Sequence, residues 1–233
     1  MHLVDCNGVA ALVFGGVLRF MLTDIRLGPN RDVRLGVVNR DRAAHYRERP
    51  GTNRLPEVYW KNVLSDGWAN LHGPAFKAAI VRSAAPFFAE LTAKYYTTDS
   101  ASDECLRGVT SSLAEYYTIL YGEPMFLQAP VLDRLQKVCD DFGLYYQRLR
   151  ELSRRSGVLA FPVRPKVHKF LHIPSIAASI NPRCCQCYAE ESCVGTVAKT
   201  WAGSKKGRYL QSVQRVVLVK RLLALLLRIE LAL

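Results

Sequence analysis

The sequence lacks the short motifs that mark several large enzyme classes. It contains no G-x-S-x-G stretch, no glycine-rich dinucleotide fingerprint and no Walker spacing of glycines before a Gly-Lys-Ser/Thr triplet. These absences argue against a nucleophile elbow, a Rossmann-type cofactor site and a P-loop. No internal repeat and no alternation of strand and helix patterns is found either, which argues against a parallel sheet.

Acidic residues are scarce relative to basic ones. The 233 residues include 32 Lys and Arg against 20 Asp and Glu, which gives a net charge of +12. The imbalance is strongest between residues 164 and 221, where 11 side chains are basic and 2 are acidic. Such a charge favours an anionic partner: nucleic acid, an anionic membrane surface or an acidic protein.

The cysteines do not form the dense, even-numbered set of a secreted disulfide framework. There are seven, and four of them lie within residues 184–193. The apolar stretch 9–18 has no Lys or Arg before it, so it does not resemble a signal peptide. We therefore expect a reducing compartment, the nucleus or the cytoplasm.

Apolar periodicity predicts a mainly α fold. Helices are expected over 9–25, 57–71, 74–96 (kinked at Pro86), 102–120 (capped by Ser102), 131–152, 190–200 and from 209 to the end. We interpret 31–56 as an exposed basic loop, 158–163 as a short strand and 164–182 as short helix and loop. The predicted domains are an N-terminal helix and basic linker (1–56), a helical domain (57–157) and a basic C-terminal region with an apolar terminal helix (158–233).

The apolar terminal helix is the second feature that points to a partner. Charged residues interrupt the run 216–233 at Lys220, Arg221, Arg228 and Glu230. A membrane span tolerates such charges poorly near its centre, so integral membrane insertion is not expected. A buried helix, or one that binds a protein partner, fits the pattern better.

Two histidines and two cysteines have spacings suited to zinc. His168 and His172 lie four residues apart and would share one face of a helix, and Cys184 and Cys187 form a C-x2-C pair. The other interpretation is that the histidines form local hydrogen bonds and the cysteines pack as small apolar side chains.

Glu190 and Glu191 are acids in a strongly basic region, where nearby positive charge keeps a carboxylate ionised. Such carboxylates can hold Mg²⁺ or Mn²⁺ for phosphoryl transfer, with Asp5 or Asp66 as a distant partner. Alternatively, they form salt bridges or occupy the first turn of a helix.

Basic residues of the C-terminal region are candidates for contacts with the phosphates of nucleic acid. Three of them stand beside glycines just before the last predicted helix, and the other interpretation there is a solvated turn. The candidates are Lys166, Lys169, Arg183, Lys199, Lys205, Lys206 and Arg208.

The stretch Pro165-Lys166-Val167-His168 to His172, followed by Tyr188, Glu190-Glu191 and Gly195, resembles the last part of some eukaryotic mobile-element transposases. The resemblance covers about 30 residues. It implies an RNase H-like core, here at most a small residual β-sheet, with the helices of 57–152 as an insertion. It also implies that acids hold divalent metal for DNA strand cleavage and transfer, with Glu190 or Glu191 as the last of them.

Two hypotheses follow. In the first, the chain is a transposase-derived protein that binds nucleic acid, with DNA as the expected form, either catalytically inactive or active as a metal-dependent DNA strand transferase or nuclease. In the second, it is a helical protein that binds a protein partner or a membrane surface through the apolar C-terminal helix.

Overall fold

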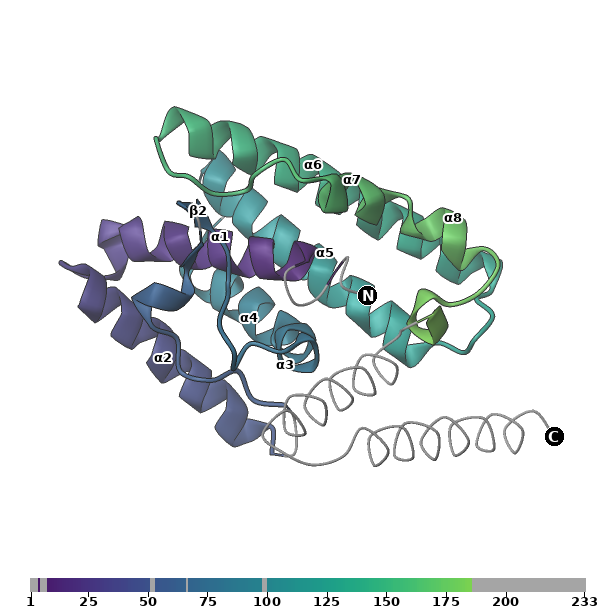
Figure 1. Ribbon diagram of the computed structural model, residues 1–233, viewed down its shortest axis with the longest axis horizontal. Coiled ribbons are helices and arrows are strands. Elements are labelled where there is room, and N and C mark those ends of the chain that lie inside the picture. Colours follow the sequence, from purple (N-terminus) through teal and green to yellow (C-terminus); the bar gives the residue numbers. More distant parts are fainter. Residues whose placement is uncertain (1–3, 5–7, 51–52, 66, 98–99, 186–233) are drawn as a thin grey trace, which may run out of the picture. The chain divides into compact units, whose positions relative to one another are not determined.

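The computed structural model describes residue 4 and residues 8–50, 53–65, 67–97 and 100–185. Met1–Cys185 form one compact unit and Gln186–Leu233 a second. The first unit therefore contains the whole of the segments 1–56 and 57–157 and the beginning of 158–233. The described part of the chain is mainly helical, as predicted (Figure 1).

Helix α1 (Val9–Thr23) is the centre of the core. Every residue from Val9 to Leu18 is buried, and the helix contacts α2, α4, α5 and α7 as well as the short strand β2. Phe14 stacks on Phe88 of α4 with 4.1 Å between the ring centroids. The helix predicted over 9–25 is confirmed, and burial on all sides explains why its sequence is almost wholly apolar.

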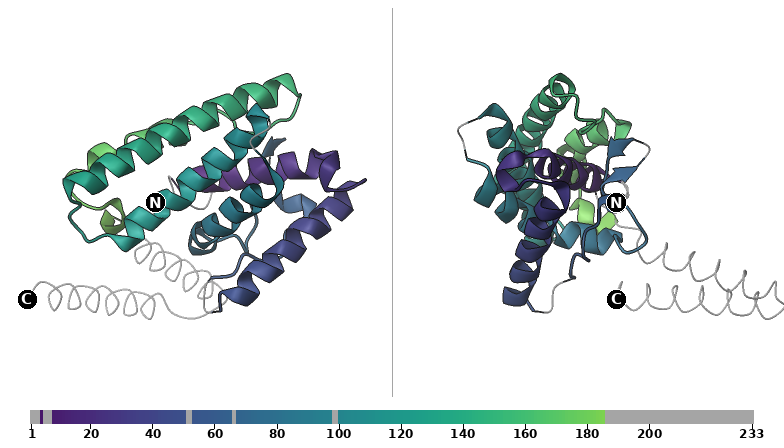
Figure 2. Two further views of the ribbon diagram at one scale, coloured as in Figure 1. Left: turned by 180° about the vertical axis from the view of Figure 1, so that it is seen from behind. Right: turned by 90° about the vertical axis from the view of Figure 1, so that its left-hand side faces the viewer.

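Two long helices, α5 (Ala101–Gly122) and α6 (Ala129–Arg155), lie side by side, and α4 (Ala85–Tyr95) packs against α5 (Figures 1 and 2). The helices predicted over 102–120 and 131–152 are confirmed. The predicted cap at Ser102 is wrong, because the Ser100 hydroxyl accepts the hydrogen bond from the Asp103 amide, at 3.1 Å. Ser100 stands before the first turn, where amides have no partner within the helix.

Two short helices, α7 (Pro165–Leu171) and α8 (Ile173–Ala177), return along α6, so the prediction of short helix and loop over 164–182 is confirmed. Phe170 anchors α7, with its ring centroid 4.9 Å from that of Tyr116 and 4.6 Å from that of Phe142. After α8 the chain forms a single 3-10 turn, η3 (Pro182–Cys185). Asn181, fully buried just before this turn, donates to the carbonyl oxygens of Leu120 and Pro124 at 3.0 Å each.

The basic loop predicted over 31–56 is wrong for most of its length. A 3-10 turn, η1 (Ile25–Leu27), leads into helix α2 (Arg31–Glu48), which Asn30 caps by accepting from the Val33 amide at 3.0 Å. Arg34 is buried and donates to the carbonyl oxygens of Leu22 and Gly28. An arginine can face the interior when carbonyl groups accept hydrogen bonds from its guanidinium. The composition of α2 alone does not predict which of its arginines has such partners.

The helix predicted over 57–71 is also wrong. The segment forms a 3-10 turn, η2 (Trp60–Asn62), and an antiparallel hairpin of β1 (Leu64–Ser65) and β2 (Trp68–Ala69). Gly67, with a φ of +79°, forms the turn. Amides after the turn donate outside the segment, that of Ala69 to Leu159 and that of Leu71 to Ala11 of α1, at 2.9 Å each. These distant acceptors favour the extended chain, and the hairpin by itself does not define an RNase H-like sheet, which stays a prediction.

The helix predicted over 74–96 is present as two helices. Helix α3 (Ala78–Ser83) ends before Ala84, and Pro86 lies in the first turn of α4 rather than at a kink. Proline is suited to that position because an amide there has no acceptor within the helix. The strand predicted over 158–163 is wrong, since this segment is irregular and Phe161 has a φ of +52°.

Candidate functional site

The residues predicted from the sequence divide into two groups. The following lie outside the described residues: Asp5, Asp66, Cys187, Glu190, Glu191, Lys199, Lys205, Lys206 and Arg208. The described candidates are Lys166, Lys169 and His168 on α7, His172 at its end, and Arg183 and Cys184 in η3. Arg183 donates to the carbonyl oxygen of Tyr121 at 3.0 Å, so part of its guanidinium holds the end of α5.

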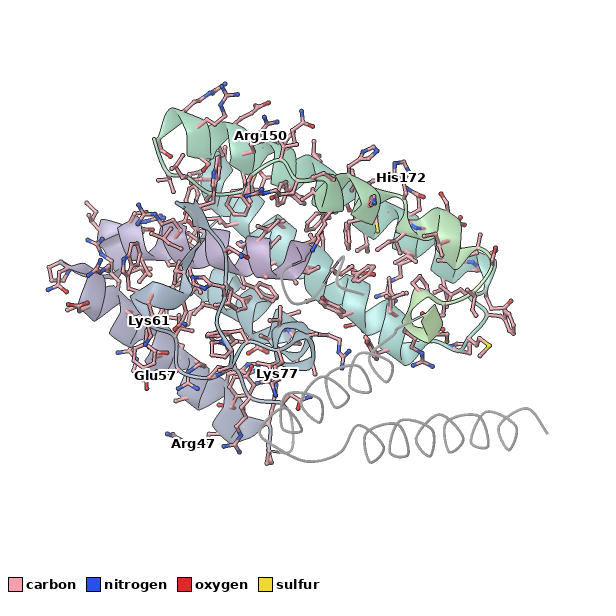
Figure 3. The ribbon with its side chains drawn as sticks, viewed as in Figure 1. Arg47, Glu57, Lys61, Lys77, Arg150 and His172 are labelled. Atoms are coloured by element: carbon pink, nitrogen blue, oxygen red, sulfur yellow. The ribbon has the colours of Figure 1, made fainter. Side chains whose placement is uncertain are left out.

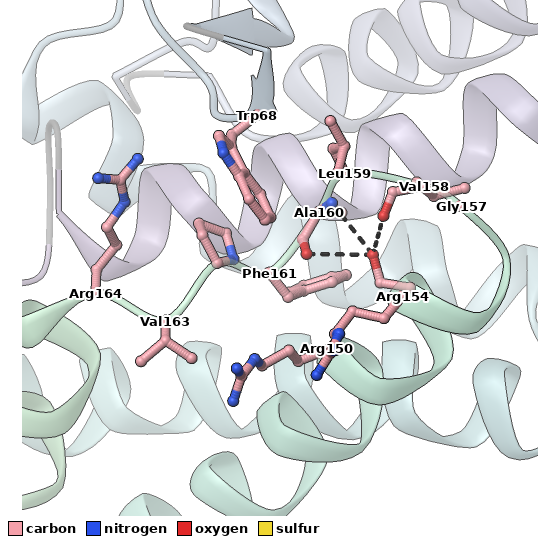
Figure 4. A pocket seen from close by; sticks show the side chains of 12 residues that line it. Trp68, Arg150, Arg154, Gly157, Val158, Leu159, Ala160, Phe161, Val163 and Arg164 are labelled. Atoms are coloured by element: carbon pink, nitrogen blue, oxygen red, sulfur yellow. Dashed lines mark hydrogen bonds between the residues drawn. The ribbon is translucent and has the colours of Figure 1, made fainter.

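A basic pocket lies beside the C-terminal half of α6. Its volume is about 560 Å³, and segment 157–164 and Trp68 of β2 complete its wall (Figure 4). Arg150, Arg154 and Arg164 are among its lining residues, and none of the lining residues that the structure describes is Asp or Glu. None of the three arginines has a salt bridge to a described residue. The pocket is therefore a concentration of positive charge without a counter-ion from the described chain.

The Ser153 hydroxyl fixes one wall of this pocket. Its Oγ lies within hydrogen-bond reach of the carbonyl oxygens of Val158 and Ala160 and accepts from the Ala160 amide at 3.1 Å. Ser153 is only 1% exposed. Because the donors and acceptors are buried, the hydroxyl satisfies groups that would otherwise destabilise the loop. A serine on α6 thus holds the segment that carries Arg164.

Phe161, one of the lining residues, packs against α1 where that helix carries two glycines. The Phe161 ring lies 5.5 Å from the ring of Tyr146, centroid to centroid, and fills the space beside Gly16. A Cβ atom at Gly16 would lie 2.7 Å from that ring, and one at Gly15 would lie 2.4 Å from the backbone of Asn70. Because Gly15 and Gly16 have no side chain, the loop that carries Phe161 and the segment that follows Trp68 can both pack directly against α1.

The Tyr146 hydroxyl is buried close to the segment that carries Arg164. Tyr146 donates to the carbonyl oxygen of Pro162 at 2.9 Å. Burial raises the pKa of the Tyr146 hydroxyl, and the positive charges of Arg164 and Arg150 act in the opposite direction.

The lining residues of the pocket suit the binding of an anion. Guanidinium groups hold phosphate or carboxylate by paired hydrogen bonds, and an indole face can stack on a planar ring. Arg154 also stands in the last turn of α6, where a cation offsets the negative end of the helix dipole.

Only part of this site could be predicted from local sequence patterns. Arg150 and Arg154 are four residues apart on or next to the helix predicted over 131–152, so the spacing indicates that they share one face of it. Trp68 lies 86 positions before Arg154 and Arg164 lies 10 positions after it, and only the folded chain brings the three residues to one pocket.

The predicted histidine pair comes together. The Nε2 atoms of His168 and His172 are 3.2 Å apart, and both side chains are exposed. Cys184 is exposed as well, whereas Cys187 lies outside the described residues. In the described part of the chain, no group of three or more His, Cys, Asp or Glu side chains is placed to hold a metal ion.

The described helices include none that is both long and apolar enough to cross a membrane. Comparison of the chain with protein-family models, with curated proteins and with solved structures finds no match.

Proposed function

We propose that the protein binds nucleic acid and that the arginine pocket holds phosphates of the strand. The observation that carries the proposal is that Arg150, Arg154 and Arg164 line one pocket whose described lining residues include no Asp or Glu. The net charge of +12 adds long-range attraction to a polyanion. Trp68 on the opposite wall supplies a ring on which a base can stack.

Descent from a transposase, and strand cleavage with Mg²⁺ or Mn²⁺, form a separate part of the proposal. They rest on Asp5, Glu190 and Glu191, which lie outside the described residues. The binding proposal does not depend on them, because it uses only side chains of the first compact unit.

The test is a charge-reversal experiment on two exposed arginines of the pocket. The double variant Arg154→Glu/Arg164→Glu changes the net charge by four units, and Arg47→Glu/Arg54→Glu changes it equally on exposed positions of another region. Figure 3 shows Arg47 at the other end of the unit from Arg150. Binding of a labelled DNA duplex and of a single strand is measured by fluorescence anisotropy at several salt concentrations.

Three phosphate contacts would weaken duplex binding by about 40-fold between 50 and 200 mM salt. Loss of two contacts lowers the slope of log affinity against log salt by about 1.8 for a duplex and about 1.4 for a single strand. We expect this change in the pocket variant and not in the control. Equal loss in both variants would assign binding to net charge alone. Absence of binding at low salt would instead favour the helical interaction protein.

A further inference from the structure

The histidine pair at the end of α7 has the geometry of a metal chelate. His168 and His172 bring their Nε2 atoms to 3.2 Å, and the planes of the two rings are inclined by 80°. An ion bonded to two imidazole nitrogens at about 2.0–2.1 Å in a tetrahedral arrangement separates them by about 3.3–3.4 Å. The observed separation therefore needs a change of only about 0.2 Å to accept such an ion.

The backbone that carries the pair is held in place. Pro165 begins α7, and Phe170, fully buried between the two histidines in sequence, packs against Tyr116 and Phe142. The histidines lie on the opposite, exposed side, and Figure 3 shows His172 on the outside of the unit. A chelate on a fixed helix loses less freedom on binding than two ligands on a mobile loop.

The surroundings of the pair decide which class of ion it suits. The exposed Lys169 lies between the two histidines in sequence, and the pair itself offers neutral nitrogen rather than carboxylate oxygen. Hard cations such as Mg²⁺ and Ca²⁺ prefer oxygen ligands, whereas Zn²⁺, Ni²⁺ and Cu²⁺ bind imidazole well. Exposure leaves the remaining coordination positions open to water.

We propose that His168 and His172 form a two-ligand site for a transition-metal dication, with Zn²⁺ as the representative ion. The site is separate from the arginine pocket, so the proposal does not rest on nucleic-acid binding. A direct N–H···N hydrogen bond between neutral rings is the other arrangement that a 3.2 Å separation allows. That arrangement would give no specific uptake of metal.

Isothermal titration of the full reduced chain with Zn²⁺ tests the site. The variants are His168→Ala, His172→Ala and, as a matched control on the same helix, Lys169→Ala. All three positions are exposed, and circular dichroism confirms that each variant is folded. Because the chain carries four cysteines between 184 and 193, the measured quantity is the difference between the wild type and each variant.

We expect one site per chain to be lost or weakened at least about ten-fold in each histidine variant, since even loss of a second-shell partner costs that much. Lys169→Ala should retain it. Isotherms of the histidine variants that match the wild type would overturn the proposal and leave only the hydrogen-bonded pair. A Zn²⁺ signal that disappears in one histidine variant but not in the other would also overturn it, because a chelate needs both rings.

Discussion

Replacement of Gly15 by alanine should destabilise the protein even though alanine is the better helix former. A Cβ atom at this position would meet the Cα, N and C atoms of Asn70 at 2.4–2.5 Å. These are backbone atoms, and the Asn70 amide donates to the carbonyl oxygen of Val63 at 2.9 Å. The strand therefore cannot move away from α1 without loss of hydrogen bonds that hold the hairpin.

The magnitude follows from two opposing effects. Overpacking of a filled core costs about 1–3 kcal/mol, and contact with fixed backbone favours the upper end. The gain in helix propensity offsets about 1 kcal/mol of this cost. We expect Gly15→Ala to lower the free energy of unfolding by about 2 kcal/mol, which corresponds to a fall in Tm of about 4–8 °C for a unit of this size.

Gly36, on the exposed side of α2, is the matched control, because a Cβ atom there would meet nothing within 4 Å. Gly36→Ala should raise stability by about 0.5–1 kcal/mol. Both variants are measured by thermal unfolding followed by far-UV circular dichroism and by urea denaturation. An increase in Tm in both variants would refute the reasoning, since it would mean that Asn70 is not packed against α1.

Three further perturbations test other parts of the unit. Burial raises the pKa of the Asp103 carboxyl but hydrogen bonds from Arg26 lower it, and the net shift is downward. The ionised Asp103 carboxylate therefore stabilises the fold above about pH 4, and this stabilisation is lost as the pH falls further. In urea denaturation, Asp103→Asn should have a lower free energy of unfolding at neutral pH, and that free energy should fall less steeply as the pH is lowered. Parallel pH profiles would contradict this. Asn181→Asp removes a buried donor to carbonyl oxygens at the end of α5 and should cost at least about 2 kcal/mol in the same assay, whereas an unchanged Tm would show that these contacts contribute little. Burial raises the pKa of the Cys139 thiol to about 12, so iodoacetamide at about pH 8 should modify the exposed Cys184 in the folded protein and spare Cys139, as peptide mass mapping would show; equal modification would contradict the burial of Cys139.

The candidate site was predicted only in part, and the reason is sequence distance. His168 and His172 share one turn of a helix, so their spacing alone predicted that they meet. The arginine pocket instead needs Trp68, Arg154 and Arg164 from separate elements. Their meeting depends on the Ser153 hydroxyl and on the space beside Gly16, and no local pattern contains that information.

The sequence by itself determined the mainly helical class and the positions of α1, α5 and α6, because burial of an apolar face at helical spacing is a local property. Only the tertiary structure decided that 31–48 is a helix, since the carbonyl groups that satisfy Arg34 include one on α1. It also decided that 64–69 is a hairpin, because the Ala69 amide donates to Leu159 and the Leu71 amide, just after the hairpin, donates to Ala11 of α1. In both segments, hydrogen bonds to distant backbone outweigh local propensity, and only the folded chain brings those partners together.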